Sequence, residues 1–185
     1  MKSSLIITSF FLFSWVLFLQ EACATGSQPA SEVISFYGEQ MGARVEGGFR
    51  KFDTDIHFNP TDLAHSRAKI IIDLNSIDLS SDDSEDEIKG KKWFNVSLFP
   101  NAIFQSTAIK GLGNDRYQVE GQLTIKGITR PLSVPMKVKT GSGSQVAEGD
   151  IDLNRLDFKV GEGDWADPES VALNVHVHYK VNLKP

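Results

Sequence analysis

The chain has 185 residues, a formal net charge of −5 and a hydrophobic content of 41%. This length is enough for one domain with one core, and a net acidic chain without a basic cluster is poorly suited to bind nucleic acid. Cys23 is the single cysteine, which excludes an internal disulfide, so the fold must be stable without cross-links.

Residues 1–24 are predicted to be a secretory signal peptide. Lys2 supplies the positive start, residues 5–19 form a mostly apolar run, and residues 22–24 (Ala-Cys-Ala) are a small-x-small cleavage site. The apolar run is shorter than the roughly 20 residues of a spanning helix, so cleavage is favoured over a retained anchor. Residues 25–30 are predicted to be a flexible leader, and residues 31–185 the folded domain.

Alternation of apolar and polar residues predicts most of the domain as β-strands. In residues 52–58 the side chains of Phe52, Ile56 and Phe58 share one strand face, and the aspartates share the other. Strands are expected at residues 31–37, 45–58, 68–75, 103–109, 117–125, 132–139, 146–153 and 171–181. Pro131 and Pro135 indicate an edge or bulged strand. Eight antiparallel strands can close into a barrel that either fills itself or holds one small ligand.

The acidic residues 80–87 (SSDDSEDE) predict the start of a short helix at residues 85–94. Ser84 and Glu87 fit a capping box, and the lysines of residues 89–92 suit the last turn of a helix. A calcium-binding loop is the alternative. It would need ligand oxygens at alternating positions, a glycine and a closing glutamate, and this run lacks that pattern.

Residues 93–109 (WFNVSLFPNAIFQSTAI) form an unusually aromatic segment. Pro100 separates the end of the predicted helix from the strand that follows it. So much aromatic surface has to be buried or bind something apolar. We expect the helix and residues 93–99 to lie across one mouth of the barrel and to contact a ligand there.

No catalytic or metal-binding constellation is recognisable. His176 and His178 share one strand face, but alternating histidines on a polar face are usually solvated, and no further metal ligand stands at a telling spacing. Asp53, Asp55 and Asp73 also fall on polar faces. No nucleophile elbow, triad order or cofactor fingerprint is present. We therefore expect a protein that is not an enzyme and that has no catalytic residues, no metal and no cofactor.

Four pieces of sequence, in this order, resemble the YceI-like family of exported, polyisoprenoid-binding, lipocalin-like proteins. They are residues 72–77 with the acidic run behind them, residues 93–106, residues 121–131, and residues 155–165. The resemblance extends from about Ser31 to Val181. It implies an all-β fold, namely an eight-stranded antiparallel lipocalin-like β-barrel with one short helix near the barrel mouth. It also implies a periplasmic protein that binds the isoprenoid chain of an amphiphilic lipid, polyprenyl or quinone-like, for transport, storage or sequestration.

The ligand-binding residues expected in the barrel lumen are taken from the apolar strand faces and the aromatic segment. They are Phe36, Phe49, Phe52, Phe58, Ile70, Ile72, Trp93, Phe94, Leu98, Phe99, Phe104, Leu123, Ile125, Leu132, Val134, Met136, Leu156, Phe158, Trp165, Val175 and Val177. The expected partners are the lipid itself and, transiently, a membrane or membrane protein. Two alternatives stay open: a lipocalin-like barrel enzyme, and a structural barrel that is filled by its own side chains and binds no ligand.

Overall fold

The structure of this chain is a computed structural model that describes residues 31–141 and 144–183. The predicted signal peptide, residues 1–24, and the predicted leader, residues 25–30, lie outside the described residues. Within the described residues, no helix has the length and apolarity that a transmembrane span requires.

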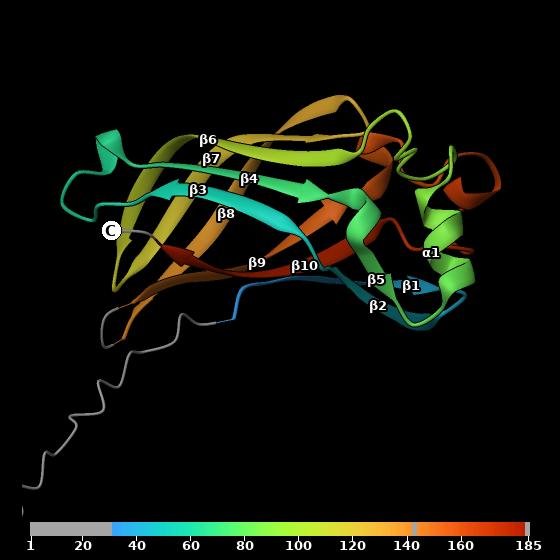
Figure 1. The fold of residues 1–185 in the computed structure, drawn as a ribbon, viewed down its shortest axis with the longest axis horizontal. Coiled ribbons are helices and arrows are strands. Elements are labelled where there is room, and N and C mark those ends of the chain that lie inside the picture. Colours follow the sequence, from blue (N-terminus) through green and yellow to red (C-terminus); the bar gives the residue numbers. More distant parts are fainter. Residues whose placement is uncertain (1–30, 142–143, 184–185) are drawn as a thin grey trace, which may run out of the picture.

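The described chain is built mainly from β-strands, with one α-helix at one end (Figure 1). The strands are β1 (Val33–Gln40), β2 (Ala43–Phe49), β3 (Phe52–His57), β4 (Arg67–Asp73), β5 (Ile77–Leu79), β6 (Asn101–Gly113), β7 (Arg116–Ile125), β8 (Ile128–Thr140), β9 (Gln145–Asn154) and β10 (Asn174–Leu183). The helices are α1 (Asp82–Lys89) and the short 3-10 helices η1 (Leu63–His65), η2 (Leu74–Ser76), η3 (Arg155–Phe158) and η4 (Gly163–Ala166).

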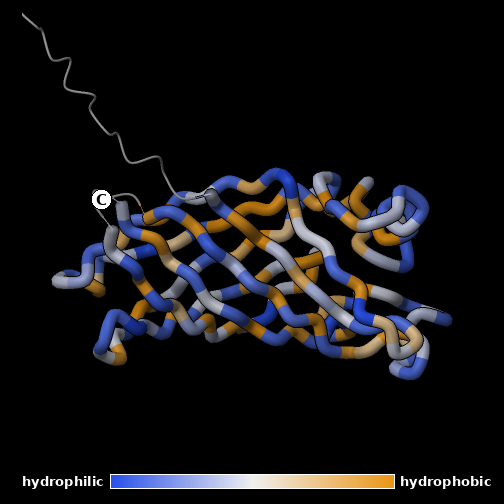
Figure 2. Tube along the Cα trace, turned by 90° about the horizontal axis from the view of Figure 1, so that it is seen from below, coloured by the Kyte–Doolittle hydropathy of each residue, from blue (hydrophilic) through white to orange (hydrophobic). Residues whose placement is uncertain are grey.

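All of these strands belong to one antiparallel sheet, in the order β3-β4-β6-β7-β8-β9-β10-β1-β2-β5. The sheet curls strongly and wraps around the interior (Figure 1). Apolar residues alternate with polar residues along the strands, as the tube in Figure 2 shows. In β8, for example, Val134, Met136 and Val138 are buried and the residues between them are exposed. This period of two places one apolar face inside the curl.

The prediction of eight strands is wrong, because the expected strand at residues 45–58 is interrupted and the short strand β5, which was not expected, follows β4. Arg50 and Lys51 separate β2 from β3, and η2 separates β4 from β5. The interruptions face each other: Arg50 N donates to Ser76 O at 2.9 Å, and Asp73 N donates to Lys51 O at 3.1 Å. On one side of the two interruptions β2 pairs with β5, and on the other side β3 pairs with β4. A strongly curled sheet has to bend, and local breaks in pairing are how strands bend.

Helix α1 starts and ends earlier than the sequence predicts. It begins after Ser81, whose carbonyl accepts the N–H of Glu85, so Ser84 lies inside the helix and the predicted capping box is not formed. Gly90 ends it, and residues 91–99 continue as turns. The charge pattern that predicted a helix is present, with acids in the first turn and Lys89 in the last.

The proline-containing strand β8 lies between β7 and β9, so the first of its two predicted alternatives, an edge strand, is wrong. It pairs with β7 along its length, but with β9 only over Lys137–Thr140. Pro131 and Pro135 therefore lie in the part of β8 that has one strand neighbour. A proline removes a donor from the ladder, and here it does so where no second strand is paired.

Candidate ligand-binding cavity

The curled sheet encloses a cavity of about 550 Å³ whose walls are mainly apolar. Side chains from every strand contribute, for example Phe36 of β1, Leu123 of β7 and Val177 of β10. A volume of this order is typical of sites that bury a small molecule. Because the lining side chains come from the inner strand faces, the cavity follows from the same alternation that forms the sheet.

One end of the cavity is covered by α1 and the turn after it. Asp83, Glu87 and Ile88 of α1 line the cavity, and so do Trp93 and Phe94. The ring of Phe94 meets the ring of Phe49 edge-on, with 6.5 Å between centroids. We call this end, with α1 and the residues around it, the mouth. Of residues 93–99, Trp93 and Phe94 thus reach the cavity at the mouth, while Phe104, later in the aromatic segment, lines the cavity from β6.

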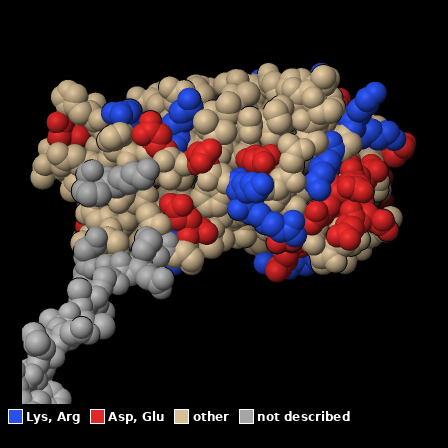
Figure 3. Space-filling view, in the orientation of Figure 1, with Lys and Arg blue, Asp and Glu red and all other residues tan. Residues whose placement is uncertain are grey.

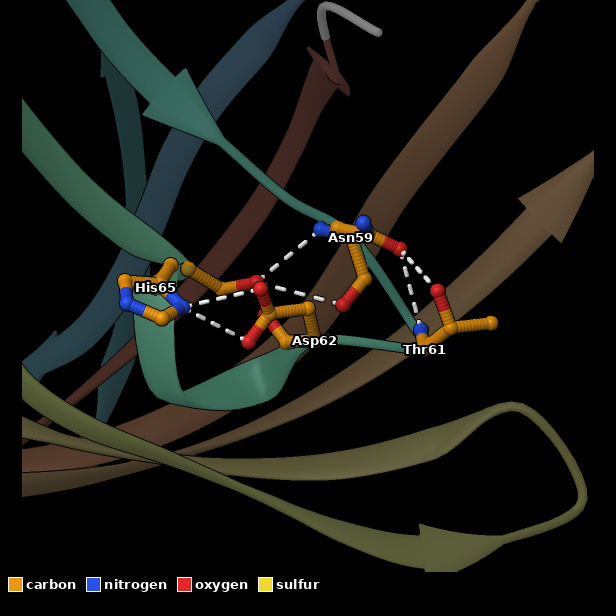
Figure 4. Close-up of polar contacts among 5 residues, drawn as sticks. Asn59, Thr61, Asp62 and His65 are labelled. Atoms are coloured by element: carbon orange, nitrogen blue, oxygen red, sulfur yellow. Dashed lines mark hydrogen bonds and ion pairs between the residues drawn. The ribbon is translucent and has the colours of Figure 1, made fainter.

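The connection between β3 and β4 lies at the opposite end of the molecule (Figure 1). Leu63 of this connection packs against the buried core of the sheet. Figure 4 shows the polar contacts that hold the turn. Asn59 Oδ1 accepts from the backbone N–H of Thr61 at 3.0 Å and from its hydroxyl at 2.8 Å, while His65 Nδ1 lies 2.8 Å from the carboxylate of Asp62. The His65 side chain therefore has a partner within this turn, namely Asp62.

Arg155 is a buried cation beside the mouth, with 4% of its surface exposed. All five of its guanidinium N–H groups face backbone carbonyls. Nε donates to Ala172 (3.0 Å), Nη1 to Val160 (2.9 Å) and Gly161 (3.0 Å), and Nη2 to Trp165 (2.5 Å) and Val171 (2.7 Å). Burial disfavours the cation and lowers the pKa of Arg155 from its ordinary value. Because every donor is occupied, Arg155 joins three loop segments and has none left for a ligand.

The two candidate metal-binding histidines lie outside the cavity. His176 Nδ1 lies 2.8 Å from Asp152 of β9, and His178 Nδ1 lies 2.8 Å from Asp150 of β9. Within residues 31–141 and 144–183, no group of three or more His, Cys, Asp or Glu side chains is arranged to hold a metal ion. The histidine pair forms two cross-strand contacts with carboxylates on the outer face of the sheet.

A family model of the YceI-like domain matches residues 27–183 of this chain. The chain belongs to the YceI-like family. The crystal structure of BcnA from Burkholderia cenocepacia is similar, with a TM-score of 0.80, 34% identity, and coverage of 83% of this chain and 96% of BcnA. A UPF0312 protein of Yersinia pestis is 36% identical over 112 residues. That alignment covers 60% of this chain and spans 57% of the length of the relative.

A more distant structure shares the fold of this YceI-like domain. It is a polyisoprenoid binding domain from Saccharophagus degradans, implicated in plant cell wall breakdown, with a TM-score of 0.67 and 14% identity. The match covers 83% of this chain and 94% of that domain. An identity this low demonstrates a shared fold and leaves the ligand of this chain to be argued from its own residues.

Most of the predicted lumen residues of this YceI-like domain do line the cavity. These are Phe36, Phe49, Phe58, Ile70, Ile72, Trp93, Phe94, Phe104, Leu123, Ile125, Leu132, Val134, Met136, Phe158, Trp165, Val175 and Val177. They come from distant parts of the sequence. The curl of the sheet brings them to one interior.

Four of the predicted lumen residues are not among those that line the cavity: Phe52, Leu98, Phe99 and Leu156. Leu98 is 69% exposed, because the turn that follows α1 directs it outward. Phe99 covers Gly127 in the turn between β7 and β8, where a Cβ atom would lie 2.8 Å from its ring. Phe52 packs against the buried core, and Leu156 is half-buried in η3.

Sequence reasoning missed two kinds of lining residue. The first kind shares a strand face with a predicted residue: Ile34 precedes Phe36 by two positions, and Ile56 precedes Phe58 by two. Period-two alternation could have found Ile34, and it placed Ile56 on the apolar face although Ile56 was not named as a lumen residue. The second kind is polar and lies at the mouth, for example Glu39, which no local pattern connects with α1.

Tyr179 of β10 is a further lining residue that the sequence did not single out. Its hydroxyl donates to Pro135 O at 2.8 Å, in the part of β8 that does not pair with β9. Burial, followed by the nearby carboxylates of Asp150 and Glu148, raises the pKa of Tyr179. The phenol therefore links β10 to β8 as a neutral donor.

Proposed function

We propose that this YceI-like protein binds the isoprenoid chain of an amphiphilic lipid, polyprenyl or quinone-like, inside the cavity. The observation that carries the proposal is a cavity of about 550 Å³ with apolar walls and a mouth that includes polar side chains. An amphiphile fits such a site, because its hydrocarbon tail can leave water while its head group stays at the mouth.

Burial of the tail provides enough free energy for useful affinity. An isoprene unit has about five carbons, so its full burial contributes on the order of 3–4 kcal/mol at ~0.8 kcal/mol per carbon. Two or three buried units give roughly micromolar binding once the costs of association are subtracted. Affinity of this order suits a protein that takes up a lipid and later releases it.

The family and the predicted signal peptide support the biological setting. We propose that the protein works in the periplasm after export through residues 1–24, as a carrier, store or sequestering protein. A lipid with a long isoprenoid tail resides in membranes, so loading needs transient contact with a membrane or a membrane protein. The related domain from Saccharophagus degradans is described as polyisoprenoid-binding, which agrees with this assignment.

Catalysis is the less favoured function. Asp53, Asp55, Asp73, His176 and His178, the titratable side chains that the sequence placed on polar faces, are absent from the lining of the cavity. The carboxylates that do line it belong to the mouth. A barrel filled by its own side chains is also disfavoured, because the described residues enclose open volume.

Extraction of the purified protein with organic solvent, followed by mass spectrometry, tests the proposal. We expect an isoprenoid lipid at close to one molecule per protein, and saturable binding of an added short-tail ubiquinone. Repeated recovery of no lipid, together with no binding of the added quinone, would refute it.

Two variants of β10 provide a matched comparison. Val175 lines the cavity, whereas its neighbour Asn174 is exposed and does not. Val175→Glu places a charge among the apolar walls and should abolish lipid recovery, and Asn174→Glu should leave it unchanged. Urea unfolding of both variants separates lost binding from lost folding. Equal lipid recovery from both would contradict the cavity as the binding site.

A further inference from the structure

The cavity follows the strands for most of their length, and its two ends differ. The lining residues of β10 are Val175, Val177, Tyr179, Val181 and Leu183. At roughly 3.3 Å per residue, the stretch from Val175 to Leu183 spans about 26 Å along the strand. Acidic side chains gather at the end of the molecule that α1 covers, which is the mouth (Figure 3). Strand β3 runs away from the mouth toward the other end of the molecule, which we call the far end (Figure 1).

Phe58 lines the cavity at the far end. It directly follows β3, it is 7% exposed, and it belongs to one buried apolar cluster with Ile109 and Val119. All three of these side chains line the cavity. The open volume at the far end is therefore surrounded by apolar side chains, which suit the end of a hydrocarbon tail rather than a polar head group.

Behind these lining residues the interior is filled. Val138 follows the lining residue Met136 on the inward face of β8 and is buried in the same cluster, yet it is not among the residues that line the cavity. Tyr117 precedes the lining residue Val119 by two positions on β7 and packs against the cluster, and it is not a lining residue either. The open volume thus ends before Val138 and Tyr117, where closely packed side chains take its place.

The ring of Phe58 is held against this filled part. It meets the ring of Tyr117 nearly edge-on, at 84°, with 4.9 Å between centroids. Leu63 of η1 packs against the same cluster. Leu63 Cδ1 and Tyr117 Cε1 lie 3.5 Å and 3.9 Å from the position that a Cβ atom would take on Gly111 of β6. An edge-on aromatic pair is attractive beyond the burial of its surface, so Phe58 is a supported wall at the end of the open volume.

We propose that Phe58 is the floor of the cavity and sets the longest isoprenoid tail that the protein accommodates. This inference rests on the proposed function, because it needs a tail in the cavity. A tail shorter than the cavity is buried completely, and every added unit leaves water. Once a tail reaches Phe58 it can go no further, so additional units stay outside the apolar walls. Phe58 is then the residue that determines specificity for tail length.

A series of ubiquinones that differ only in tail length tests this role. The series is offered as a mixture in phosphatidylcholine vesicles, and gel filtration separates the protein from the vesicles. Mass spectrometry then gives the ratio of protein-bound to vesicle-bound quinone for each tail. Because a unit leaves water in either environment, the ratio should vary by less than about threefold while the tail fits. Beyond that limit it should fall by about tenfold or more per added unit, since the burial of about five carbons is lost.

Three variants show whether Phe58 sets the limit. Phe58→Ala should move the limit to longer tails by about one isoprene unit, because the ring that it removes is about as large as one unit. Phe52→Ala is the matched control. Phe52 is an aromatic residue of the same strand and packs against the same cluster, but it is not a lining residue, so the limit should stay in place. Val119→Phe enlarges a lining side chain near the floor and should move the limit to shorter tails.

The outcomes separate the two proposals. If no quinone of the series passes from the vesicles to the unmodified protein, the proposed function fails. If quinones bind and the ratio does not depend on tail length, the function stands and the cavity has no floor. An unchanged limit in Phe58→Ala, or an equal shift in Phe52→Ala, overturns the role of Phe58. Urea unfolding shows which variants fold. If Phe58→Ala does not, an unchanged limit in Val119→Phe overturns the floor instead.

Discussion

Replacement of Arg155 by methionine should destabilise the fold far more than any surface arginine would. Methionine keeps a long apolar stem and removes the guanidinium, which leaves five backbone carbonyls without their donor. These carbonyls belong to the segments between β9 and β10, which include η4. Their loss of partners would release the loops that Arg155 holds together beside the mouth.

The magnitude follows from two opposing contributions. An unpaired buried polar group costs about 1–3 kcal/mol, so five of them cost about 5 kcal/mol at the lower end. Removing the cation also removes its own desolvation cost, which is several kcal/mol, and part of the loop can relax into water. We expect a net loss of about 3–4 kcal/mol, a large part of the roughly 5–15 kcal/mol by which a domain is stable.

Urea unfolding followed by circular dichroism measures this loss, and Arg130→Met is the matched control. Arg130 is exposed and makes one long contact, from Nε to Asp157 O at 3.3 Å, so its replacement should change the free energy of unfolding by less than about 0.5 kcal/mol. Arg155→Lys should lie near Arg155→Met, because an ammonium with three donors cannot reach five carbonyls. If Arg155→Met and Arg130→Met change the free energy of unfolding by similarly small amounts, Arg155 does not hold the loops together as proposed.

Two further predictions concern the mouth. Phe94→Ala should weaken lipid retention strongly, while it lowers the free energy of unfolding by less than the roughly 3–5 kcal/mol lost when an aromatic core site is emptied. Leu98→Ala should change neither quantity, because Leu98 is exposed. Lipid retention and urea unfolding, measured on both variants, test this prediction. The pKa of Glu85 is lowered, first by the N–H of Leu79 and then by Lys89, so its carboxylate stabilises the fold above the unfolded pKa of about 4.5, and this contribution is lost as the pH falls through the lower pKa of the folded state. Glu85→Gln should therefore be less stable than the unmodified protein at pH 7 in urea titrations, and the difference should shrink as the pH falls below about 4.5. A difference that stays constant as the pH is lowered would contradict this linkage.

The sequence by itself determined the inner faces of the strands and the position of the acidic helix to within a few residues. Both depend on local rules. A strand exposes alternate side chains to opposite faces, so Val134 and Met136 could be assigned to the interior without knowledge of their neighbours. The charges of residues 80–92 likewise favour a helix in any context.

Only the tertiary structure decided where the strands break and which residues meet at the mouth. The interruptions at Arg50 and at η2 exist because two curled strands bend at the same place, and neither segment contains a turn signal strong enough to predict this. Leu98 and Phe99 looked like lumen residues by composition, yet the turns after α1 direct one outward and place the other on Gly127.

The site itself shows the same division. Apolar walls follow from alternation, because each strand contributes independently of the others. The five partners of Arg155 and the carboxylates at the mouth depend on loops far apart in the sequence meeting in space. Composition and spacing carry no information about which donor finds an acceptor, since that is decided only when the sheet curls and the loops close over it.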